Sequence, residues 1–419
     1  MKKAIELAEY IKGGAFDDKL TAMYGTARLE EQRRRWYGAA ESFAAMFGDR
    51  PVMMFSVPGR SEICGNHTDH NHGAVMAAAI DLDTIGAAAV NENGSVRLFS
   101  EGYGLTETMS DANESDVKRG TSASLVAGMC DSLRHEGYEC GGFDVWCTSQ
   151  VLEGSGLSSS ASFEVFVGTV INHLFNCGSI DPVTVARAAQ RAENVFFGKP
   201  CGLMDQTACA VGGFVFIDFE DPQKPVVRKL SHDLADMGML LCITDTGGSH
   251  ADLTDDYASI PAEMKAVALE LGCSVLRDAD EGEFYDSLAR LRGTCSDRAL
   301  LRAAHFFAEN RRVFEAADAV ENCDREGFLD VVRRSGDSSF KYLQNLYSPA
   351  APEQQGLPLA LALSGDVVCR VHGGGFAGTV QAFLDPARLE QYRSRMESVF
   401  GAGSCRCLNV RSAGATRLL

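Results

Sequence analysis

The sequence has few positive charges for its length. It contains 39 Lys and Arg residues against 57 Asp and Glu residues, which gives a formal net charge of −18. Surfaces that bind nucleic acids or anionic membranes need basic patches, so this balance argues against both classes of partner. A local anion site stays open, because backbone amides and a few cationic side chains can hold a phosphate in an acidic protein.

The sequence also lacks an uninterrupted apolar run long enough to cross a bilayer. Its first residues, MKKAIELAEYIKGG, start with positive charge, but Glu6, Glu9 and Lys12 interrupt the apolar core that a signal peptide needs. The pattern is better explained as an amphipathic helix. We therefore expect a cytoplasmic protein with no membrane partner.

Paired cysteines of the C-x-x-C type are absent. The 14 cysteines are scattered, often inside apolar runs such as LLCIT, and are typical of reduced thiols. Cys405 and Cys407 are the one close doublet, and an alternating strand explains them equally well. A zinc–cysteine site is therefore not expected.

The length and the order of apolar patterns predict two α/β domains. A chain of 419 residues exceeds the size at which single cores stop growing. Residues 84–100 suggest a hairpin turning at Asn93-Gly94, residues 122–135 a helix, and residues 142–149 a strand. Strands and helices continue to alternate toward the C-terminus. The Pro-containing stretch EDPQKP (220–225) is the best candidate boundary, which predicts domains 1–224 and 225–419.

Polar residues are concentrated in the stretch GNHTDHNHG (65–73). Three of the nine histidines, His67, His70 and His72, lie within six residues together with Asp69. This spacing alone favours a metal site. Another function that needs imidazoles and a carboxylate packed this closely is the alternative, and both interpretations stay open at this point.

A glycine- and serine-rich turn, EGSGLSSSAS (153–162), leads directly into a helical apolar stripe. The first amides of a helix are unpaired and carry partial positive charge, so they can bind phosphate. Hydroxyls at this position can reach phosphate oxygens or Mg²⁺. An ordinary loop with a serine cap is the alternative. No Lys-Ser/Thr pair follows the glycines, so this is not a Walker A loop.

Two further stretches suggest a working site. VHGGGFAGTV (371–380) has three consecutive glycines, which are tolerated where the backbone passes close to a ligand, although a tight turn is the commoner explanation. KPCGLMDQTACAVGG (199–213) places one carboxylate, Asp205, in surroundings otherwise uncharged beyond Lys199. Such an acid is either a helix cap or a group tuned by its environment.

Taken together, these motifs give the chain a clear resemblance to the galactokinases of the GHMP kinase family. VPGRSEICGNHTDHNHG resembles the galactokinase signature, GSGLSSSAS the phosphate-binding motif, CGLMDQ the segment with the catalytic aspartate, and VHGGGFAG the third glycine-rich motif. They follow in the family's order from about residue 51 to 383. The resemblance implies a two-domain α/β fold with the active site in the cleft between the domains.

The resemblance implies ATP-dependent, Mg²⁺-requiring phosphorylation of galactose at C1, with these roles. Asp205 would be the catalytic carboxylate, with Arg60 holding it ionised. Ser160 and Glu193 would coordinate Mg²⁺. The sugar would be bound by Asn66, His67, Asp69, His70, Gly202 and Tyr257. ATP would be bound by Gly154, Ser155, Gly156, Leu157, Ser158, Ser159, Ser160, Ala161, Gly373, Gly374 and Gly375.

The chain departs from the family pattern at two places. Galactokinases usually have Glu-His-Thr-Asp-Tyr where this chain has Asn66-His67-Thr68-Asp69-His70. The usual Glu accepts a hydrogen bond from the C6 hydroxyl of the sugar. Asn66 can also donate, so it would tolerate a carboxylate at C6, as in galacturonate. Near the adenine pocket, Ser122 and Leu125 stand where the family often has Trp and Tyr. Stacking on the base must then come from elsewhere.

A non-catalytic sugar sensor is the alternative from another functional class. Such relatives of galactokinase have lost residues of the phosphate loop, whereas GLSSSAS is complete here and Arg60, Glu193 and Asp205 are present. An enzyme is therefore favoured. Its partners would be a small sugar and ATP, and a monomer would suffice.

Overall fold

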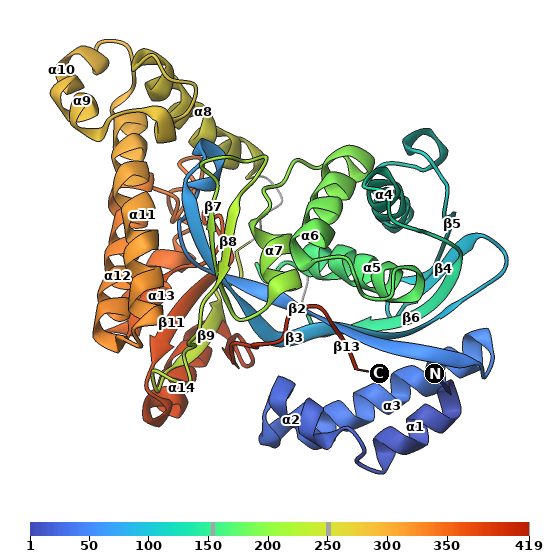
Figure 1. Cartoon of the computed structure of the whole chain (residues 1–419). Coiled ribbons are helices and arrows are strands. Elements are labelled where there is room, and N and C mark those ends of the chain that lie inside the picture. The colour runs from blue at the N-terminus through green and yellow to red at the C-terminus, as the bar shows by residue number, and fades with distance from the viewer. Residues whose placement is uncertain (152–155, 249–252, 419) are drawn as a thin grey trace.

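The computed structural model describes residues 1–151, 156–248 and 253–418. These residues form two sheets with helices packed on them, so the predicted two-domain α/β architecture is confirmed (Figure 1). Gly154 and Ser155, predicted to bind ATP, lie outside the described residues. Within those residues, no helix combines the length and the apolar character needed to cross a membrane.

The larger sheet has nine strands, in the order β1-β2-β3-β6-β4-β5 with β7, β8 and β13 attached at its side. Its strands are β1 (Lys2–Lys3), β2 (Pro51–Cys64), β3 (Ala74–Val90), β4 (Ser95–Ser100), β5 (Gly104–Met109), β6 (Phe143–Ser149), β7 (Phe214–Asp218), β8 (Val226–Lys229) and β13 (Thr416–Arg417). The long strands β2 and β3 are antiparallel and almost fully buried. Both faces of this sheet are therefore covered.

The hairpin predicted for residues 84–100 is wrong. The turn at Asn93-Gly94 exists, but β6 lies between β3 and β4, antiparallel to β3 and parallel to β4. Strand β6 is buried over most of its length, and the interior position covers its apolar residues on both sides. Long-range burial therefore overrides the local hairpin signal.

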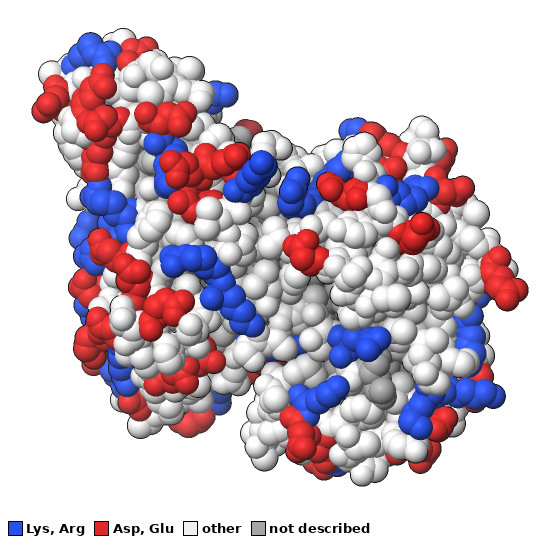
Figure 2. Space-filling model, viewed as in Figure 1, with Lys and Arg blue, Asp and Glu red and all other residues white. Residues whose placement is uncertain are grey.

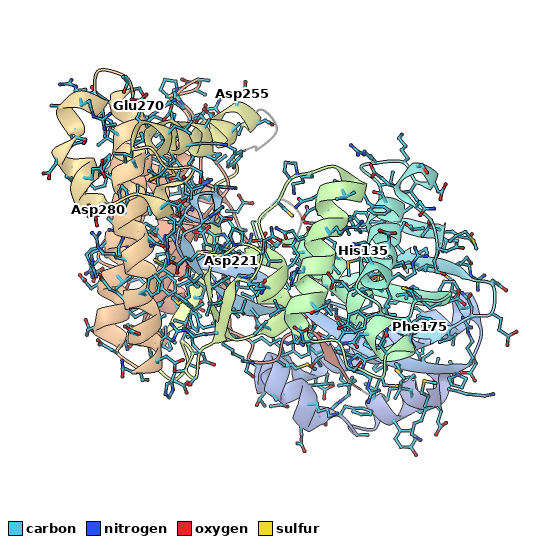
Figure 3. The ribbon with its side chains drawn as sticks, turned by 45° about the horizontal axis from the view of Figure 1, so that its top comes forward. His135, Phe175, Asp221, Asp255, Glu270 and Asp280 are labelled. Carbon is cyan, nitrogen blue, oxygen red and sulfur yellow. The ribbon has the colours of Figure 1, made fainter. Side chains whose placement is uncertain are left out.

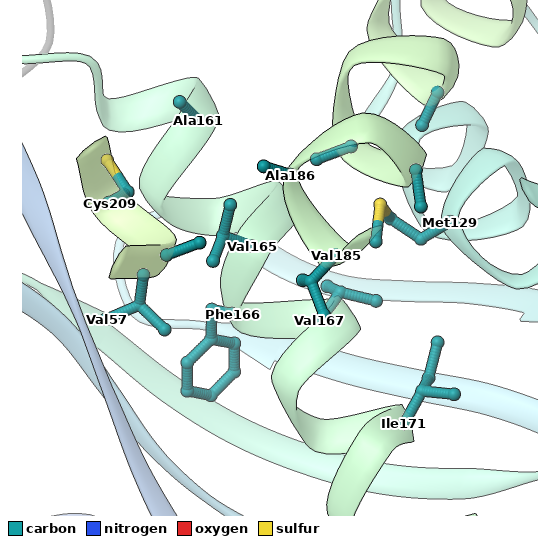
Figure 4. Close-up of a cluster of buried hydrophobic side chains, with 14 of the residues drawn as sticks. Val57, Met129, Ala161, Val165, Phe166, Val167, Ile171, Val185, Ala186 and Cys209 are labelled. Atoms are coloured by element: carbon teal, nitrogen blue, oxygen red, sulfur yellow. The ribbon is translucent and has the colours of Figure 1, made fainter. Parts of the chain in front are cut away.

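Helices cover the two faces of the larger sheet. One face carries α4 (Ser122–His135), α5 (Ser159–Phe175), α6 (Pro182–Arg191) and α7 (Met204–Val211); the other carries α1 (Ala4–Lys12), α2 (Asp17–Tyr24) and α3 (Leu29–Phe47) (Figure 1). Val165, Phe166 and Ile171 of α5 are buried in the core beneath α5 and α6 (Figure 4). As predicted, Asp181 caps α6, accepting from the amides of Val183 and Thr184. This packing fixes the first turn of α5, where the glycine- and serine-rich loop ends.

The smaller sheet has four antiparallel strands in the order β10-β11-β9-β12. They are β9 (Leu240–Asp245), β10 (Val368–Val371), β11 (Thr379–Leu384) and β12 (Cys405–Leu408). The same unit contains α8 (Thr254–Glu270), α9 (Glu281–Asp286), α10 (Leu288–Leu291), α11 (Asp297–Glu321), α12 (Arg325–Ser338), α13 (Gly356–Ser364) and α14 (Leu389–Phe400), with α8 to α10 forming a lobe away from the sheet (Figure 1). The turn between β10 and β11 is the third glycine-rich motif.

The expected boundary between residues 224 and 225 falls inside a hairpin of the larger sheet. Strand β8, beyond that boundary, pairs with β7, and the C-terminal strand β13 returns to pair with β2. The two sheets also share a buried core, in which Ile63 and Met76 meet Leu241 and Val313. The N-terminal unit therefore includes β8 and the end of the chain, and the two units are packed against each other.

On the face shown in Figure 2, the molecule is hollowed between the lobe of α8 to α10 and the helices α4 and α6. Figure 3 turns the same region toward the viewer, with Asp255 near the start of α8 on one side and His135 at the end of α4 on the other. The predicted site residues come from elements on both sides of this hollow.

Candidate active site

Arg60 and Asp205, the predicted catalytic pair, are held together by two hydrogen bonds. Nε of Arg60 donates to Oδ1 of Asp205 at 2.7 Å, and Nη2 donates to Oδ2 at 2.6 Å. Arg60 lies on β2 and Asp205 in the first turn of α7, so the pair joins the sheet to the helix that covers it. A bidentate arginine–carboxylate pair fixes both the position and the plane of the carboxylate.

The electrostatic environment keeps Asp205 ionised. Burial raises the pKa of Asp205, but the charge and hydrogen bonds of Arg60 and the hydroxyl of Ser158 outweigh it, so the pKa is lowered from its ordinary value. The Asp205 side chain is still 31% exposed, whereas that of Arg60 is 9% exposed. One side of the carboxylate therefore remains open to a ligand.

The start of α5 has the geometry of an anion site. Ser158 takes a left-handed conformation, with φ 60° and ψ 60°, and its hydroxyl donates to Asp205. Among the described residues, no side chain caps α5 through this N-cap position. The amides of the first turn are therefore available to a bound phosphate, and the strained backbone at Ser158 is typical of ligand-binding loops.

The loop before α5 is packed tightly against β2. The backbone amide of Arg60 donates to the carbonyl of Leu157 at 3.1 Å, and Nη1 of Arg60 donates to the carbonyl of Gly156. A side-chain carbon added at Gly59 would come within 2.7 Å of the Leu157 carbonyl, so this contact requires glycine. Ser159, Ser160 and the buried Ala161 follow in the first turn of α5. The catalytic pair and the loop thus position each other.

Ser160 and Glu193, the predicted Mg²⁺ ligands, face each other. The Ser160 hydroxyl lies 3.5 Å from Oε1 of Glu193, which sits in the π-helical turn η4 (Ala192–Phe197) after α6. Gln206 donates to the other carboxylate oxygen at 3.0 Å, and Nζ of Lys199 lies 3.2 Å from Oε1. Hydroxyl and carboxylate oxygens suit Mg²⁺, which is often held by one or two protein ligands and phosphate oxygens. The residues present therefore fit the ion.

A second carboxyl group, Glu164 of α5, lies near this pair. Burial, and then the charge of Glu193, raise the pKa of Glu164 to about 9. Its side chain is fully buried and accepts a hydrogen bond from Gln206 at 3.2 Å. Glu164 is therefore neutral at pH 7.

Two cavities contain predicted site residues. One, of about 390 Å³, is lined by Ser159 and Ser160 and by Ser122, Leu125, Tyr103 and Phe163. Ser122 and Leu125 are the positions at which the family's usual aromatic residues are missing. Tyr103, Phe163 and Phe197 supply aromatic surface around the same cavity, which sequence reasoning did not anticipate.

The other cavity, of about 830 Å³, gathers most of the predicted sugar ligands. His67, Asp69, His70, Gly202 and Tyr257 all line it. A side-chain carbon at Gly202 would come within 2.5 Å of Oδ2 of Asp69, so the glycine leaves room for this carboxylate. His67, Asp69 and His70 come from the segment between β2 and β3, and Gly202 lies just before α7, whereas Tyr257 comes from α8, so the cavity lies between the two units.

The triple-glycine turn, Gly373–Gly375, presents carbonyl groups to the loop GNHTDHNHG (65–73), called the signature loop below, and to Tyr257 of α8. Nε2 of His67 donates to the carbonyl of Gly374 at 2.9 Å, and the hydroxyl of Tyr257 donates to that of Gly375 at 2.8 Å. Burial, and then His70, lower the pKa of His67 to about 4, so the ring is neutral. A side-chain carbon at Gly374 would lie 2.5 Å from the Tyr257 ring. Gly373 to Gly375 were expected at the ATP phosphates; in the structure this turn contacts His67 and Tyr257, and its role in ATP binding stays a prediction.

Asn66 is the predicted sugar ligand that the structure does not bring to the cavity. Its side chain is buried, and Nδ2 donates to Glu62 at 3.1 Å and to the carbonyl of Gly373 at 2.7 Å. Its Oδ1 accepts from Asn345 at 2.7 Å. The amide is thus used inside the protein, and Asn66 is not among the described residues that line the cavity.

Several supporting residues were missed by sequence reasoning. Glu62 accepts from Asn66 and from Arg370, at 3.1 and 3.0 Å, so a buried ion pair supports the loop. On α11, Glu309 accepts from the amide of Gly65 at 3.0 Å, and His305 contacts the carbonyl of Asn66 at 3.0 Å. A charged residue at position 62, two residues after Arg60 in an otherwise apolar strand, was the available signal.

The histidines of the signature loop do not form a metal centre with their neighbours. Within residues 1–151, 156–248 and 253–418, no group of three or more His, Cys, Asp or Glu side chains is arranged to hold a metal ion. His67 instead donates to the glycine turn, and His70 lies at the cavity with its ring 5.9 Å from that of His67. Of the two interpretations of this loop, polar ligand recognition agrees with the geometry.

Comparisons with known proteins agree with this geometry. A model described as the GHMP kinases N terminal domain matches residues 124–213, and one described as the galactokinase galactose-binding signature matches residues 41–90. A galactokinase of Streptomyces coelicolor is 32% identical over 389 residues, covering 90% of this chain and 97% of the relative. A galactokinase of Clostridium tetani is 27% identical, covering 85% and 90%.

Solved structures give the same result. The structure of Lactococcus lactis galactokinase complexed with galactose has a TM-score of 0.75 at 27% identity, covering 90% of this chain and 98% of that one. The mevalonate kinase of Methanococcus jannaschii, at 13% identity and a TM-score of 0.60, shares the fold. The resemblance drawn from the motifs is confirmed: this chain is a sugar kinase that belongs to the galactokinase family of GHMP kinases.

Proposed function

We propose that this enzyme transfers the γ-phosphoryl group of ATP to the C1 hydroxyl of galactose, giving galactose 1-phosphate and ADP. The observation that carries the proposal is the placement of Asp205. This carboxylate is clamped by Arg60, bonded to Ser158 at the start of α5, and open on one side. It thereby lies at the start of α5, and Gly202 and Leu203, just before it in the chain, line the larger cavity.

Asp205 would bind the C1 hydroxyl and receive its proton. Its lowered pKa makes it a weak base, so early deprotonation of the sugar is not its main contribution. Phosphoryl transfer passes through a loose transition state, in which little base strength is required of the protein. Asp205 therefore acts chiefly by aligning the hydroxyl oxygen and takes the proton late.

Arg60 would serve this step in two ways. Its bidentate bond fixes the orientation of Asp205, and its remaining charge offsets negative charge near the transferring group. The α5 amides and the hydroxyls of Ser158 to Ser160 would hold the phosphates. Bound Mg²⁺ would supply positive charge to the phosphate oxygens, with Ser160 and Glu193 as its protein ligands.

The nucleotide base would occupy the cavity of about 390 Å³ beside Ser159 and Ser160. Tyr103, Phe163 and Phe197 would give it aromatic and apolar contacts in place of those that Ser122 and Leu125 cannot provide. Because ATP is the phosphoryl donor and is held inside cells, we place the enzyme in the cytoplasm.

The sugar would occupy the cavity of about 830 Å³, with Asp69 and His67 at its hydroxyls, Gly202 at the floor and Tyr257 as a wall. Asn66 would act indirectly, by holding the carbonyl of Gly373. Galactose as the substrate agrees with what the Lactococcus lactis relative binds and with the match to the galactose-binding signature.

Galacturonate is a second candidate, favoured by the charges of the same cavity. His70, His72 and Lys199 line it together with His67, and the acid among its lining residues is Asp69. Asn66 brings no carboxylate to the cavity, so Asp69 is the one acid among the described lining residues that would repel an anionic group at C6.

Turnover with a panel of sugars tests the proposal. Release of ADP is measured with Mg²⁺ and ATP on galactose, galacturonate, glucose and N-acetylgalactosamine. We expect the highest kcat/KM with galactose. Good turnover of galacturonate with poor turnover of galactose would reverse the assignment, and sugar binding without turnover of any sugar would favour a non-catalytic sensor.

A further inference from the structure

Lys199 is a cation that contacts Glu193, one of the two predicted Mg²⁺ ligands. Its Nζ lies 3.2 Å from Oε1 of Glu193, the same oxygen that the Ser160 hydroxyl approaches at 3.5 Å. Glu193 is buried, with its side chain 4% exposed, whereas that of Lys199 is 63% exposed. The ammonium group therefore reaches in from the cavity and neutralises a buried carboxylate where Mg²⁺ is expected.

Two cations cannot share this oxygen at low cost. A bound Mg²⁺ and the ammonium group would repel each other at a carboxylate surrounded by protein. Of the two, Lys199 is free to move, because it is largely exposed, carries a flexible four-carbon stem, and makes its one ion pair within the described residues to Glu193. Occupation of the metal site should therefore displace Lys199 from Glu193.

The surroundings indicate where the displaced ammonium group would go. Lys199 lines the cavity of about 830 Å³ proposed for the sugar, together with Asp69 and Gly202. Along the chain, Gly202 and Leu203, which line the same cavity, stand between Lys199 and Asp205. The region between Glu193 and Asp205 is the one that the γ-phosphoryl group crosses if the proposed function is correct.

Arg60 leaves a role for a second cation in this region. Three of its N–H groups are already used, two on Asp205 and one on the carbonyl of Gly156. It is therefore anchored and cannot follow the phosphoryl group as charge moves toward the leaving and attacking oxygens. A flexible ammonium group can do so.

We propose that Lys199 is a mobile catalytic cation, which neutralises Glu193 when the metal is absent and contacts the transferring phosphoryl group when Mg²⁺ and ATP are bound. The inference rests on the proposed function and adds a residue to its catalytic machinery. It also predicts competition: Lys199 opposes metal binding at Glu193 and Ser160, while increasing the rate of transfer once the metal is in place.

The decisive variant is Lys199→Gln. Glutamine can still donate a hydrogen bond to Glu193, so folding is preserved, but it carries no charge. We expect kcat at saturating Mg²⁺, ATP and sugar to fall about 100-fold, as when one group that stabilises transition-state charge is removed. The sugar KM should change less than about threefold. Lys199→Arg keeps a cation and should retain more of kcat, and Lys224→Gln, on an exposed turn, should match wild type.

Metal binding gives a readout that does not depend on turnover. Mn²⁺ binding in the presence of ADP, followed by electron paramagnetic resonance, should be tighter in Lys199→Gln than in wild type, because the competing cation is gone. Unchanged or weaker Mn²⁺ binding would overturn the competition, and an unchanged kcat would overturn the catalytic role. An unchanged kcat with a raised sugar KM would make Lys199 a sugar ligand instead.

The same data separate failure of this inference from failure of the proposed function. Kinetic comparisons use whichever sugar the wild-type enzyme phosphorylates. If wild type phosphorylates none, the proposed function fails, while Mn²⁺ binding still reports on Lys199. Melting temperatures of all variants identify a loss of folding. If Lys199→Gln does not fold, the comparison uses Lys199→Arg and the control Lys224→Gln. Equal kcat values for these two variants support the role of the charge. A 100-fold lower kcat for Lys199→Arg contradicts it.

Discussion

Asp83 and Asp205 are both bound by arginine, yet their surroundings differ. The Asp83 carboxylate is fully buried and bonded to Arg35, Arg411, Tyr24 and Ser56. Asp205 has a bidentate bond to Arg60 and one to Ser158, and remains 31% exposed. In both, burial raises the pKa and arginine lowers it below the ordinary value.

The difference shows what turns a buried ion pair into a candidate catalytic group. The Asp83 carboxylate accepts hydrogen bonds from four protein side chains. These bonds connect α2 and α3 to β2, β3 and the C-terminal segment. Around Asp205, Arg60 and Ser158 hold the carboxylate but leave 31% of the side chain exposed. The same chemistry therefore serves stability at one place and reactivity at the other.

Replacing Asp205 should have the largest effect on activity. Asp205→Asn keeps the shape but cannot accept the proton or carry the charge, so we expect kcat to fall about 1,000-fold, within the range for loss of a general base. Sugar affinity, measured by calorimetry, should change far less. Near-normal turnover of this variant would contradict the proposed catalytic role of Asp205 and remove the difference from Asp83.

Replacing Asp83 should affect stability. Asp83→Asn leaves Arg35 and Arg411 without a charged partner in the interior, so the free energy of unfolding should fall by about 3–5 kcal/mol. Activity per folded molecule should be unchanged. Urea titration against Asp286→Asn, an exposed control, measures the difference. A loss of kcat without loss of stability would contradict the assignment.

The pH dependence of stability should carry the same signature. Because the folded-state pKa of Asp83 is lowered, its contribution is fully present above the unfolded-state pKa and is lost as the pH falls through the folded-state pKa. Between these two values, the wild-type free energy of unfolding should decrease with acid. The Asp83→Asn variant should show a flatter profile there, and parallel profiles would contradict the role of Asp83.

Asn66 should show an intermediate effect. If Asn66 only accepted a hydrogen bond from the sugar, Asn66→Glu would preserve activity on galactose. In the structure the amide donates to Glu62 and Gly373, so a carboxylate would face another carboxylate and leave a buried carbonyl unpaired. We expect activity to fall more than about tenfold with any sugar. The double variant with Glu62→Gln should recover part of it; no recovery would mean that the pair is not coupled.

Ser160 should show the smallest effect. Ser160→Ala removes one oxygen near Glu193, and water can replace it as a ligand of Mg²⁺. We expect the Mg²⁺ concentration for half-maximal activity to rise several-fold, with little change in kcat at saturation. Ser259→Ala, on α8 away from the metal pair, serves as the control. An unchanged Mg²⁺ requirement would make Ser160 part of the helix start only.

The sequence could predict the elements whose signals are local. The helices α4, α5 and α6 follow from apolar periodicity, and Asp181-Pro182 marks the start of α6. The motif order also identified the Arg60–Asp205 and Ser160–Glu193 pairs, which the structure brings together. These residues lie on well-defined elements, so their position in the chain determines their position in space.

The failed predictions depended on contacts distant in sequence. The insertion of β6 between β3 and β4 is decided by burial over some fifty residues. The inward direction of Asn66 is decided by Glu62, Asn345 and the Gly373 carbonyl, which only the folded chain brings together. A motif identifies which residues lie near a ligand, but not which of them the protein uses for its own hydrogen bonds.

The most direct test of the proposed function is the identity of the product. Wild-type enzyme, Asp205→Asn and Asp83→Asn are incubated with galactose, Mg²⁺ and ATP, and the sugar phosphate is examined by ³¹P NMR and mass spectrometry. We predict phosphate on the anomeric oxygen with wild type and with folded Asp83→Asn, and almost none with Asp205→Asn. Phosphate at another carbon, or equal product with Asp205→Asn, would contradict the assignment of Asp205 as the carboxylate that acts on the C1 hydroxyl.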